Sequence, residues 1–356
     1  MKILMVVPAF APHIGGIETH VLQVCKHLSA LGICCSVITP KMNRAWPDRE
    51  RFEGIEVARY PKNMKMLFII WLWLLANVRM IIQADIVHCH DFTFLVYLPF
   101  RFIFWRKRVY ETFHGYDVPL SLTGYPIKKQ WILIRKLIRI LCAGAICVGR
   151  YIPKWYGTRC DKFVYGGPRS TWQSGSQPVL RPKSCAYVGR LDADTGVDEL
   201  VRALGVLNKR YKIDISLDVI GDGLLRGFLE NLAKENNLRV TFHGVVPDPR
   251  KYLESCEFVF ASGNLTIVEA LNLAKPVLAS YRDPVRRDYL RYWQALAGDA
   301  LIIERTADKL AERIAELYLE PRRLTYLRVA AQQAGPEFSW ESVAREYADL
   351  YASVHH

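Results

Sequence analysis

The sequence lacks the features that would place it in several other protein classes. Its longest apolar stretch, 66–82, contains Asn77 and Arg79 and falls short of the ~20 residues that a membrane-spanning helix needs. We therefore expect this stretch to be buried or interfacial. Residues 3–7 follow a single Lys2 without a small-residue cleavage site, which predicts a first buried strand and no signal peptide. With 51% hydrophobic and 23% charged residues, the composition is that of a folded globular protein.

The cysteines form no disulfide framework. There are nine of them, Cys34 and Cys35 are adjacent, and no regular spacing links the rest. This usage predicts a reduced, cytosolic compartment. The run 88–91 reads His-Cys-His-Asp, yet neighbouring residues of a strand point to opposite faces, so no metal site is expected there.

Positive charge is confined to one half of the chain. Residues 1–180 hold 24 Lys and Arg against 10 Asp and Glu, a balance of +14, whereas residues 181–356 hold 24 against 25, a balance of −1. A basic half beside a neutral half indicates two domains with different partners, of which the first binds something anionic. No nucleic-acid-binding module is visible, and the aromatic residues lie in long aliphatic runs, so nucleic acid is not expected.

The length and the pattern of apolar runs predict two α/β domains with parallel sheets. In the first, strands are expected at 3–7, 35–38, 55–60, 86–90, 109–112 and 145–148, and helices at 17–31, 67–82 and 127–141. In the second, strands are expected at 184–188, 215–220, 240–242, 258–261 and 276–279, and helices at 197–209, 224–236, 250–255, 266–273 and 306–320. We expect domains at 1–165 and 184–337, a turn-rich linker at 166–183, and a helix at 338–356 that returns to the first domain.

Glycine-bearing segments follow several of these strands. Gly15 and Gly16 come after the first strand and open a helix, where a bare backbone and a helix N-terminus suit an anion. An ordinary βα turn would look the same. Gly189 and Arg190 follow the strand 184–188, and an arginine at such a strand end can hold a diphosphate. A surface arginine in a loop is the plainer alternative.

The next strand ends in the second half carry similar chemistry. One bears Gly221 and Asp222, and the following one bears Gly244. Segment 262–271 runs from a strand into a helix, and the residues whose N–H groups could receive phosphate oxygens there are Asn264, Leu265 and Thr266. Glu269 could accept hydrogen bonds from a ribose diol. Each segment alone has a structural explanation, but their order at successive ends of one sheet indicates a nucleotide site.

This ordered set resembles glycosyltransferase family 4, the retaining, nucleotide-sugar-dependent enzymes of the GT-B fold. The resemblance covers nearly the whole chain and rests on segments 12–19, 85–91, 112–115, 189–192, 221–223, 242–244, 265–279 and 338–341. It implies two Rossmann-like domains that face each other across a cleft, with a C-terminal helix that crosses back to the first.

The resemblance also implies roles for individual residues. Gly15 and Gly16 would approach the donor phosphates and the transferred sugar, and His114 would contact the sugar near the reacting carbon. Arg190 would neutralise the leaving diphosphate, while Glu269 would bind the nucleotide ribose. Members of the family generally need no metal, so no cofactor is expected beyond the donor itself, and cations with helix N-termini would stabilise the departing charge.

Two positions depart from the family's pattern. Thr195 stands where the family usually has a lysine, and Ala261 stands where it usually has a glutamate, eight residues before Glu269. Loss of the lysine is expected to cost transition-state stabilisation unless another cation substitutes for it. The candidates lie in a presumed loop after residue 280 and are Arg282, Arg286 and Arg287.

Three segments of the basic half mix cations with aromatic residues. On a helical wheel of 127–141, one side carries Lys128, Lys129, Arg135, Lys136 and Arg139. The opposite side carries Ile127, Trp131, Ile134, Ile138 and Leu141. The run 101–108 adds Arg106, Lys107 and Arg108, and the stretch 66–82 adds Trp71 and Trp73. Such segments favour contact with anionic lipid, although a core-packed helix with a solvated basic face is the alternative for each.

The sequence thus predicts a peripheral enzyme on the cytoplasmic face of the cell membrane. It would transfer a sugar from a nucleoside-diphosphate sugar to a lipid or lipid-linked glycan acceptor, with retention of configuration. The resemblance further implies that the leaving phosphate assists deprotonation of the acceptor. Three alternatives stay open at this point: a non-catalytic binding subunit, a nucleotide-sugar epimerase on the same fold, and a soluble transferase.

Overall fold

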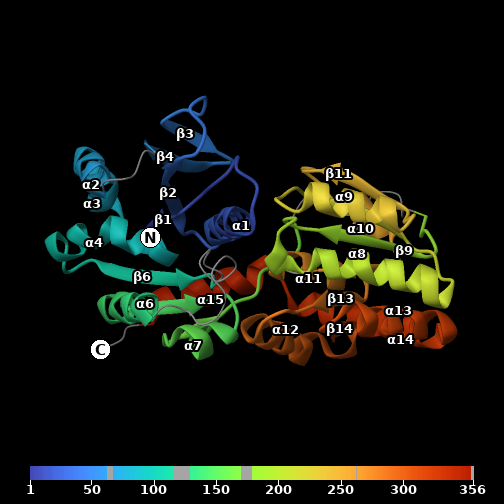
Figure 1. Cartoon of the computed structure of the whole chain (residues 1–356). Coiled ribbons are helices and arrows are strands. Elements are labelled where there is room, and N and C mark those ends of the chain that lie inside the picture. Colours follow the sequence, from blue (N-terminus) through green and yellow to red (C-terminus); the bar gives the residue numbers. More distant parts are fainter. Residues whose placement is uncertain (62–66, 116–128, 170–178, 262, 354–356) are drawn as a thin grey trace. The chain divides into compact units, whose positions relative to one another are not determined.

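The chain folds into two compact α/β units. The computed structural model describes residues 1–61, 67–115, 129–169, 179–261 and 263–353. The first unit, called unit 1, comprises residues 1–165 together with 340–356, and unit 2 comprises residues 166–339. Figure 1 shows their strands and helices. Within the described residues, no helix has both the length and the apolar character needed to cross a membrane.

Unit 1 is built on an eight-stranded sheet in the order β3-β4-β2-β1-β5-β6-β7-β8. Its strands are β1 (Lys2–Val6), β2 (Cys34–Lys41), β3 (Arg49–Phe52), β4 (Ile55–Pro61), β5 (Ile86–His90), β6 (Arg108–Phe113), β7 (Gly144–Cys147) and β8 (Lys162–Phe163). Only the β3–β4 pair is antiparallel. Because β1 lies between β2 and β5, the sheet reverses its order at the carboxyl end of β1, where α/β folds place ligands.

The helices of unit 1 include the chain's last one. They are α1 (Gly16–Ala30), α2 (Leu67–Ala76), α3 (Val78–Gln83), α4 (Phe94–Ile103), α6 (Lys129–Leu141), α7 (Tyr151–Tyr156) and α15 (Trp340–Ala352). The single helix expected at 67–82 is wrong: it is divided at Asn77, whose Nδ2 donates to the Trp73 carbonyl at 2.7 Å. Helix α15 packs beside α1, so the end of the chain completes the core of unit 1.

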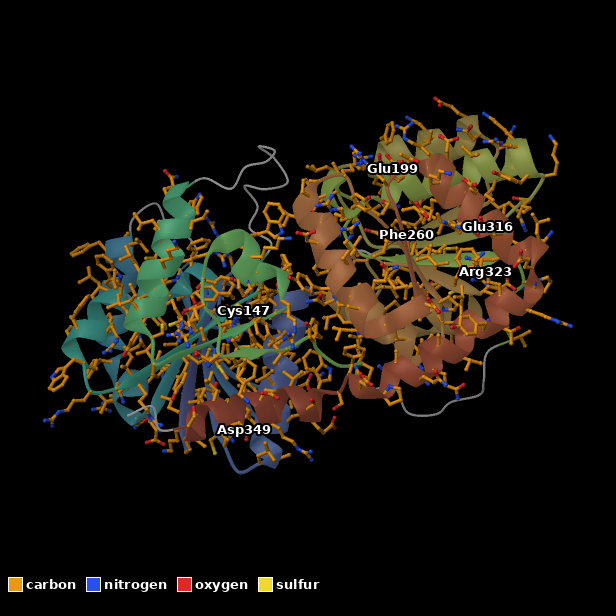
Figure 2. The ribbon with its side chains drawn as sticks, turned by 90° about the horizontal axis from the view of Figure 1, so that it is seen from below. Cys147, Glu199, Phe260, Glu316, Arg323 and Asp349 are labelled. Atoms are coloured by element: carbon orange, nitrogen blue, oxygen red, sulfur yellow. A yellow bond between two sulfur atoms is a disulfide. The ribbon has the colours of Figure 1, made fainter. Side chains whose placement is uncertain are left out.

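Unit 2 has a fully parallel six-stranded sheet in the order β11-β10-β9-β12-β13-β14. Its strands are β9 (Ser184–Val188), β10 (Ser216–Ile220), β11 (Val240–Gly244), β12 (Phe258–Phe260), β13 (Val277–Ser280) and β14 (Leu301–Glu304). Phe260, labelled in Figure 2, lies in the core of this sheet beside Tyr187. The strand order reverses at β9, so residues 189–192 leave the sheet at its switch point.

Seven helices are described in unit 2. They are α8 (Val197–Val206), α9 (Arg226–Glu235), α10 (Arg250–Ser255), α11 (Asn264–Asn272), α12 (Pro284–Ala297), α13 (Ala307–Leu319) and α14 (Pro321–Ala334). The presumed loop that would carry Arg286 and Arg287 is wrong, since both residues lie on α12. The Glu316–Arg323 ion pair, 2.9 Å long, joins α13 to α14 (Figure 2).

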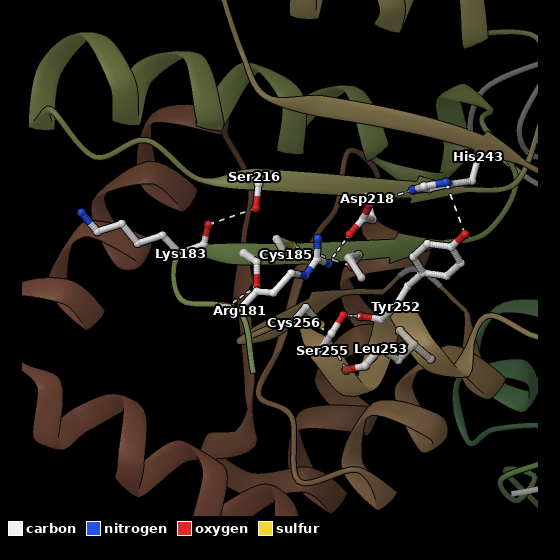
Figure 3. A network of polar contacts seen from close by, with 12 residues as sticks. Arg181, Lys183, Cys185, Ser216, Asp218, His243, Tyr252, Leu253, Ser255 and Cys256 are labelled. Atoms are coloured by element: carbon white, nitrogen blue, oxygen red, sulfur yellow. Dashed lines mark hydrogen bonds and ion pairs between the residues drawn. The ribbon is translucent and has the colours of Figure 1, made fainter. Parts of the chain in front are cut away.

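A polar network fixes the start of unit 2 to its sheet (Figure 3). Arg181, just before β9, pairs with Asp218 on β10. The other oxygen of Asp218 lies 2.7 Å from Nε2 of His243, whose Nδ1 is 3.3 Å from the Tyr252 hydroxyl. The side chains of Arg181, Asp218, His243 and Tyr252 thus each have a polar partner within this network, as partly buried polar groups require.

The expectation that every cysteine is reduced is wrong at one pair. Cys147, at the end of β7, is disulfide-bonded to Cys160, with the two Cα atoms 5.9 Å apart. Strands β7 and β8 are neighbours, so Cys160, two residues before β8, is brought next to the end of β7. The other seven cysteines are free.

Candidate functional site

The glycine loop after β1 brings its backbone against a carboxylate. Gly15 is the N-cap of α1, with an extended φ of −173°. A Cβ on Gly15 would collide with the Glu18 carboxylate, which lies 2.5 Å from Nδ1 of His13. A bare backbone at the N-terminus of a fifteen-residue helix is a suitable place for an anion.

Histidines gather at the carboxyl ends of β5 and β6. Nδ1 of His90 lies 2.9 Å from Nε2 of His114, and the ring of His20 meets His114 edge-on with the centroids 5.0 Å apart. Burial, aided by the positive charge of Arg135, lowers the pKa of His114 to about 3. The half-buried His114 ring is therefore neutral at pH 7 and can exchange hydrogen bonds with a hydroxyl group.

Helix α15 supports this histidine cluster with two tyrosines that the sequence analysis missed. The Tyr347 hydroxyl lies 2.9 Å from Nε2 of His20 and 2.8 Å from Oγ1 of Thr112. His88 bridges the Tyr351 hydroxyl and Thr112, with 2.7 Å to each. The i, i+4 spacing of the two tyrosines was the available signal, because it places them on one helix face.

At residues 88–91, where the sequence predicted no metal site, the side chains are arranged differently from the alternation that the prediction used. His88 and His90 share one face of the strand, as residues two apart must, and their rings are 5.1 Å apart. Only Cys89 points away. Across the described residues, no group of three or more histidine, cysteine, aspartate or glutamate side chains is arranged to hold a metal ion.

In unit 2, the loops after β9, β10 and β11 touch through their backbones. Gly221 has φ +137°, and a Cβ there would collide with the carbonyl oxygen of Gly189. The Gly221 N–H donates to the Gly244 carbonyl at 2.8 Å, and the Leu191 N–H donates to the Asp222 carbonyl at 2.9 Å. The structure thus brings these four site candidates together, at the end of the sheet where ligands bind.

Glu269 is almost wholly buried on α11, with 1% of its surface exposed. Burial raises the pKa of this carboxyl to about 7, although the nearby charge of Arg169 opposes the rise. Arg169 is a residue that the sequence analysis missed. Its Nε lies 3.0 Å from Oε1 of Glu269, and its Nη1 donates to the Pro247 carbonyl at 2.8 Å. The polar linker composition around it gave no sign of this contact.

The side chains at the start of α11 are engaged within unit 2. Oδ1 of Asn264 accepts hydrogen bonds from the Tyr289 hydroxyl and from Nε1 of Trp293, both at 2.7 Å. Oγ1 of Thr266 donates to the Val188 carbonyl at 3.1 Å. What residues 264–266 can offer an anion is therefore the backbone N–H groups of the first helical turn.

Arg190 is exposed but is held by acids of its own loop. It pairs with Asp192 and, at 2.8 Å, with Asp194. Oγ1 of Thr195 donates to the Asp192 carbonyl at 2.7 Å, so the residue in the lysine's usual place closes a turn. Reaching a diphosphate requires Arg190 to leave these carboxylates.

The three expected substitutes for the missing lysine are also engaged. Arg282 pairs with Asp198 and, at 3.2 Å, with Glu199. Nε of Arg287 lies 3.6 Å from the carboxylate of Asp288. The third candidate, Arg286, is buried on α12 with 4% exposed.

The helical-wheel prediction for 127–141 is wrong at Arg135. This residue is buried in unit 1, with 1% exposed, because aromatic rings and an acid surround its guanidinium. Arg139 pairs with Asp161 at 2.7 Å. Lys136 is exposed as expected, but large apolar side chains share the outer surface of α6, since Leu133, Leu137 and Ile140 are 58%, 52% and 77% exposed. Lys128 lies outside the described residues, as does the side chain of Lys129.

The other expected membrane-facing residues divide into three groups. Lys107 donates to the Ala84 carbonyl and Arg108 to the Tyr351 carbonyl, so both are used within unit 1. Arg106 is exposed and lies over the exposed ring of Trp105 at 5.0 Å. The three tryptophans that were expected to face the membrane, Trp71, Trp73 and Trp131, are half-buried.

Two family models match the chain, one in each unit. "Glycosyltransferase Family 4" matches residues 14–160, and "Glycosyl transferases group 1" matches residues 169–334. Together they cover all the site candidates of unit 2 and the histidine cluster of strands β5 and β6.

Individual relatives are similar over different lengths. An uncharacterised glycosyltransferase of Methanocaldococcus jannaschii is 22% identical, covering 99% of this chain and 98% of its own. The N-acetylgalactosamine-N,N'-diacetylbacillosaminyl-diphospho-undecaprenol 4-alpha-N-acetylgalactosaminyltransferase of Campylobacter jejuni is 35% identical over 100 residues. That match spans 26% of this chain and 26% of the Campylobacter protein.

A solved structure shares the fold over the full length. HepE of Anabaena, in complex with UDP and glucose, superposes with a TM-score of 0.76 at 16% identity, covering 99% of this chain and 100% of its own. The two-unit architecture is that of GT-B glycosyltransferases.

Proposed function

Because the chain belongs to the glycosyltransferases of family 4, we propose that it is a retaining enzyme acting on a lipid or lipid-linked glycan. Its donor is a nucleoside-diphosphate sugar, and it works at the cytoplasmic face of a membrane. Donor binding is proposed from the site candidates at the strand ends of unit 2. Loops that contact one another through glycine backbone lie there, and the same unit holds the buried carboxylate of Glu269.

Each part of the donor meets chemistry suited to it. Glu269 accepts hydrogen bonds from the two ribose hydroxyls, which requires its carboxylate form and the departure of Arg169. The diphosphate lies at the N-terminus of α11, where the backbone N–H groups of the first turn and the helix dipole favour negative charge. Arg190, released from Asp192 and Asp194, then neutralises the leaving phosphate.

Unit 1 supplies His114 to the transferred sugar. The ring is neutral because burial lowers its pKa to about 3, so it acts as a hydrogen-bond partner and adds no charge near the reacting carbon. A positive charge there would oppose the cationic character that develops at the sugar during transfer. The leaving phosphate oxygen takes the acceptor's proton as the new bond forms on the same face.

The acceptor proposal rests on an exposed apolar surface in the basic half of the chain. Large side chains on α6 and at the end of α4 are open to solvent, namely Leu133, Leu137, Ile140, Phe102, Ile103 and Trp105. Helix α2 adds Phe68, Leu72 and Leu75. Apolar groups amid a charge balance of +14 suit the interface of an anionic lipid bilayer. The undecaprenol-linked substrate in the Campylobacter relative's name supports a lipid-linked acceptor.

A transfer assay tests the proposal. The purified protein is incubated with radiolabelled UDP-glucose, UDP-N-acetylglucosamine or UDP-N-acetylgalactosamine and a bacterial membrane lipid extract. We expect label to enter the organic phase with one donor, and this transfer to be lost in Glu269→Ala. Conversion of a donor without lipid would indicate an epimerase. Absence of both transfer and nucleotide binding would indicate a non-catalytic relative.

A further inference from the structure

Arg135 occupies a site in unit 1 shaped for a guanidinium group. It projects from α6 and is 1% exposed. Its guanidinium carbon lies 4.4 Å from the ring centroid of Tyr156, 5.2 Å from that of Phe113 and 5.3 Å from that of Phe92. The three rings come from α7, β6 and the turn after β5. Such contacts strengthen when the cation is removed from water, and the flat group is fixed in orientation by the rings.

Two buried acids are among the charged neighbours of Arg135. Nη2 of Arg135 lies 3.8 Å from Oδ1 of Asp91. Glu111 is fully buried on β6, and neither of its oxygens has a hydrogen-bond partner among the described residues. Burial raises the pKa of both carboxyls, and the positive charge of Arg135 opposes the rise at both. For Asp91 the result is a pKa of about 6, which leaves it ionised at pH 7.

Asp91 in turn holds the backbone at His114. Its Oδ1 accepts the His114 backbone N–H at 2.9 Å. The aspartate adopts φ +52°, a left-handed conformation that few residues take outside glycine, asparagine and aspartate. The His114 ring is held separately, by Nδ1 of His90 at 2.9 Å. The segment that carries His114 is thus attached at its backbone to one acid, and that acid faces one cation.

We infer that Arg135 is a positioning residue for glycosyl transfer, which fixes the backbone of His114 through Asp91. This inference rests on the proposed role of His114 at the sugar. Without the cation, the Asp91 carboxyl takes up a proton near neutral pH and becomes a weaker acceptor for the His114 N–H. His114 then samples more positions, and misplacing a group beside the reacting carbon lowers the rate of the chemical step.

Variants that separate positioning from folding are available. Arg135→Met removes the charge, Arg135→Lys keeps it, and Asp91→Asn keeps the acceptor oxygen without charge. The matched control is Arg150→Met, since Arg150 also lies over an aromatic ring, that of Phe163 at 5.2 Å, but is exposed. Folding of each variant is checked by near-ultraviolet circular dichroism. Should Arg135→Met fail to fold, Arg135→Lys and Asp91→Asn carry the test.

The kinetic readout is UDP release from UDP-glucose, UDP-N-acetylglucosamine and UDP-N-acetylgalactosamine between pH 5 and pH 8.5. We expect kcat to fall about 10- to 100-fold in Arg135→Met while the donor KM changes less than about twofold. The profile is that of kcat at saturating donor, where the ionisation of Glu269 that donor binding needs affects KM instead. Its acid limb, near pH 6 in the wild type, moves to higher pH in Arg135→Met. Arg135→Lys moves it back, and Asp91→Asn abolishes it. Among the described residues, the titratable and charged groups that interact with Asp91 include Arg135, Glu111 and Tyr347, and Asp91 also accepts the His114 backbone N–H.

Hydrogen–deuterium exchange gives a readout that needs no donor. In a peptide covering residues 108–115, we expect exchange of the His114 amide to accelerate at least about tenfold in Arg135→Met and, less strongly, in Asp91→Asn. Arg150→Met leaves it unchanged. If the wild type shows no turnover, the proposed function is refuted. The exchange of the His114 amide still decides whether Arg135 positions that residue. The inference would be overturned if Arg135→Met and Asp91→Asn fold and show wild-type exchange at His114. If the wild type turns over, these variants would also have to show wild-type kcat.

Discussion

Arg169 covers Glu269: its Nε lies 3.0 Å from Oε1 of a carboxylate that is 1% exposed. The acid that the family resemblance assigns to the ribose is therefore already occupied by a cation from the start of unit 2. Under the proposed function, a ribose diol and the Arg169 guanidinium would compete for the Glu269 carboxylate. Donor binding then includes the free energy of breaking this ion pair.

This competition predicts that Arg169→Ala binds UDP more tightly than the wild type. Because loss of Arg169 raises the pKa of Glu269 further, calorimetry is run at several pH values from 8 to 9.5. Once Glu269 is ionised in both proteins, the dissociation constant is expected to fall about five- to tenfold, equivalent to ~1 kcal/mol. Arg181→Ala is the control, because it removes another paired arginine of unit 2. Weaker binding in Arg169→Ala would show instead that Arg169 contacts the donor.

Burial of Glu269 predicts a pH-dependent effect of its removal on stability. The folded pKa of about 7 lies above the ordinary value of 4.5, so the folded state keeps a proton that the unfolded state releases. Ionisation of Glu269 thus lowers the free energy of unfolding progressively as the pH rises from 4.5 to 7. Above pH 7 this destabilisation reaches its full size. Denaturant unfolding should find Glu269→Gln more stable than the wild type at pH 8, by up to about 3 kcal/mol, and similar at pH 4.5. An equal difference at both pH values would contradict this assignment.

The contact between the loops after β9 and β10 predicts that Gly221 tolerates no side chain. Gly221→Ala places a Cβ against the Gly189 carbonyl at φ +137°. We expect a loss of at least about 2 kcal/mol in the unfolding of unit 2, together with weaker UDP binding. Gly227→Ala is the matched control, because nothing lies within 4 Å of a Cβ at that helical position. A neutral Gly221→Ala would mean that the two loops separate readily.

The exposed face of α6 predicts lipid binding through apolar contacts. Leu137→Asp places a charge on a side chain that is 52% exposed, so folding is spared while insertion into lipid is opposed. In flotation with vesicles containing phosphatidylglycerol, we expect at least about a tenfold loss of binding. Leu319→Asp, at a 76% exposed leucine of unit 2, should float as the wild type does. Equal losses in both variants would remove α6 from the docking surface.

The sequence predicted the parallel strands well, because strands buried on both faces read as short apolar runs. Strand β5 begins and ends where it was expected, and every one of its residues is buried. Three edge strands were missed, β3, β8 and β14. The sequence of β3, Arg-Glu-Arg-Phe, shows no apolar alternation, and β8 has only two residues. The break at Asn77 was missed because the apolar pattern continues across it.

The site could be predicted where one segment determines it and not where distant segments meet. Glycines after strands indicated the backbone-only loops, and their φ values and close approaches explain that signal. A helical wheel treats every arginine as exposed, whereas Arg135 is buried by rings from three other segments. Arg169 was missed for the same reason, because its partner Glu269 is 100 residues further along the chain.

Nucleotide binding at Glu269 is the central claim, and a thermal-shift screen against UDP, GDP, dTDP and ADP tests it most directly. A ligand that binds only the folded state stabilises it by ~2.7 kcal/mol at a hundredfold excess over its dissociation constant. The account predicts a clear rise in Tm with one nucleoside diphosphate, lost in Glu269→Ala and reduced in Arg190→Ala. A wild type whose Tm responds to none of the four, or a shift that survives in Glu269→Ala, would contradict it.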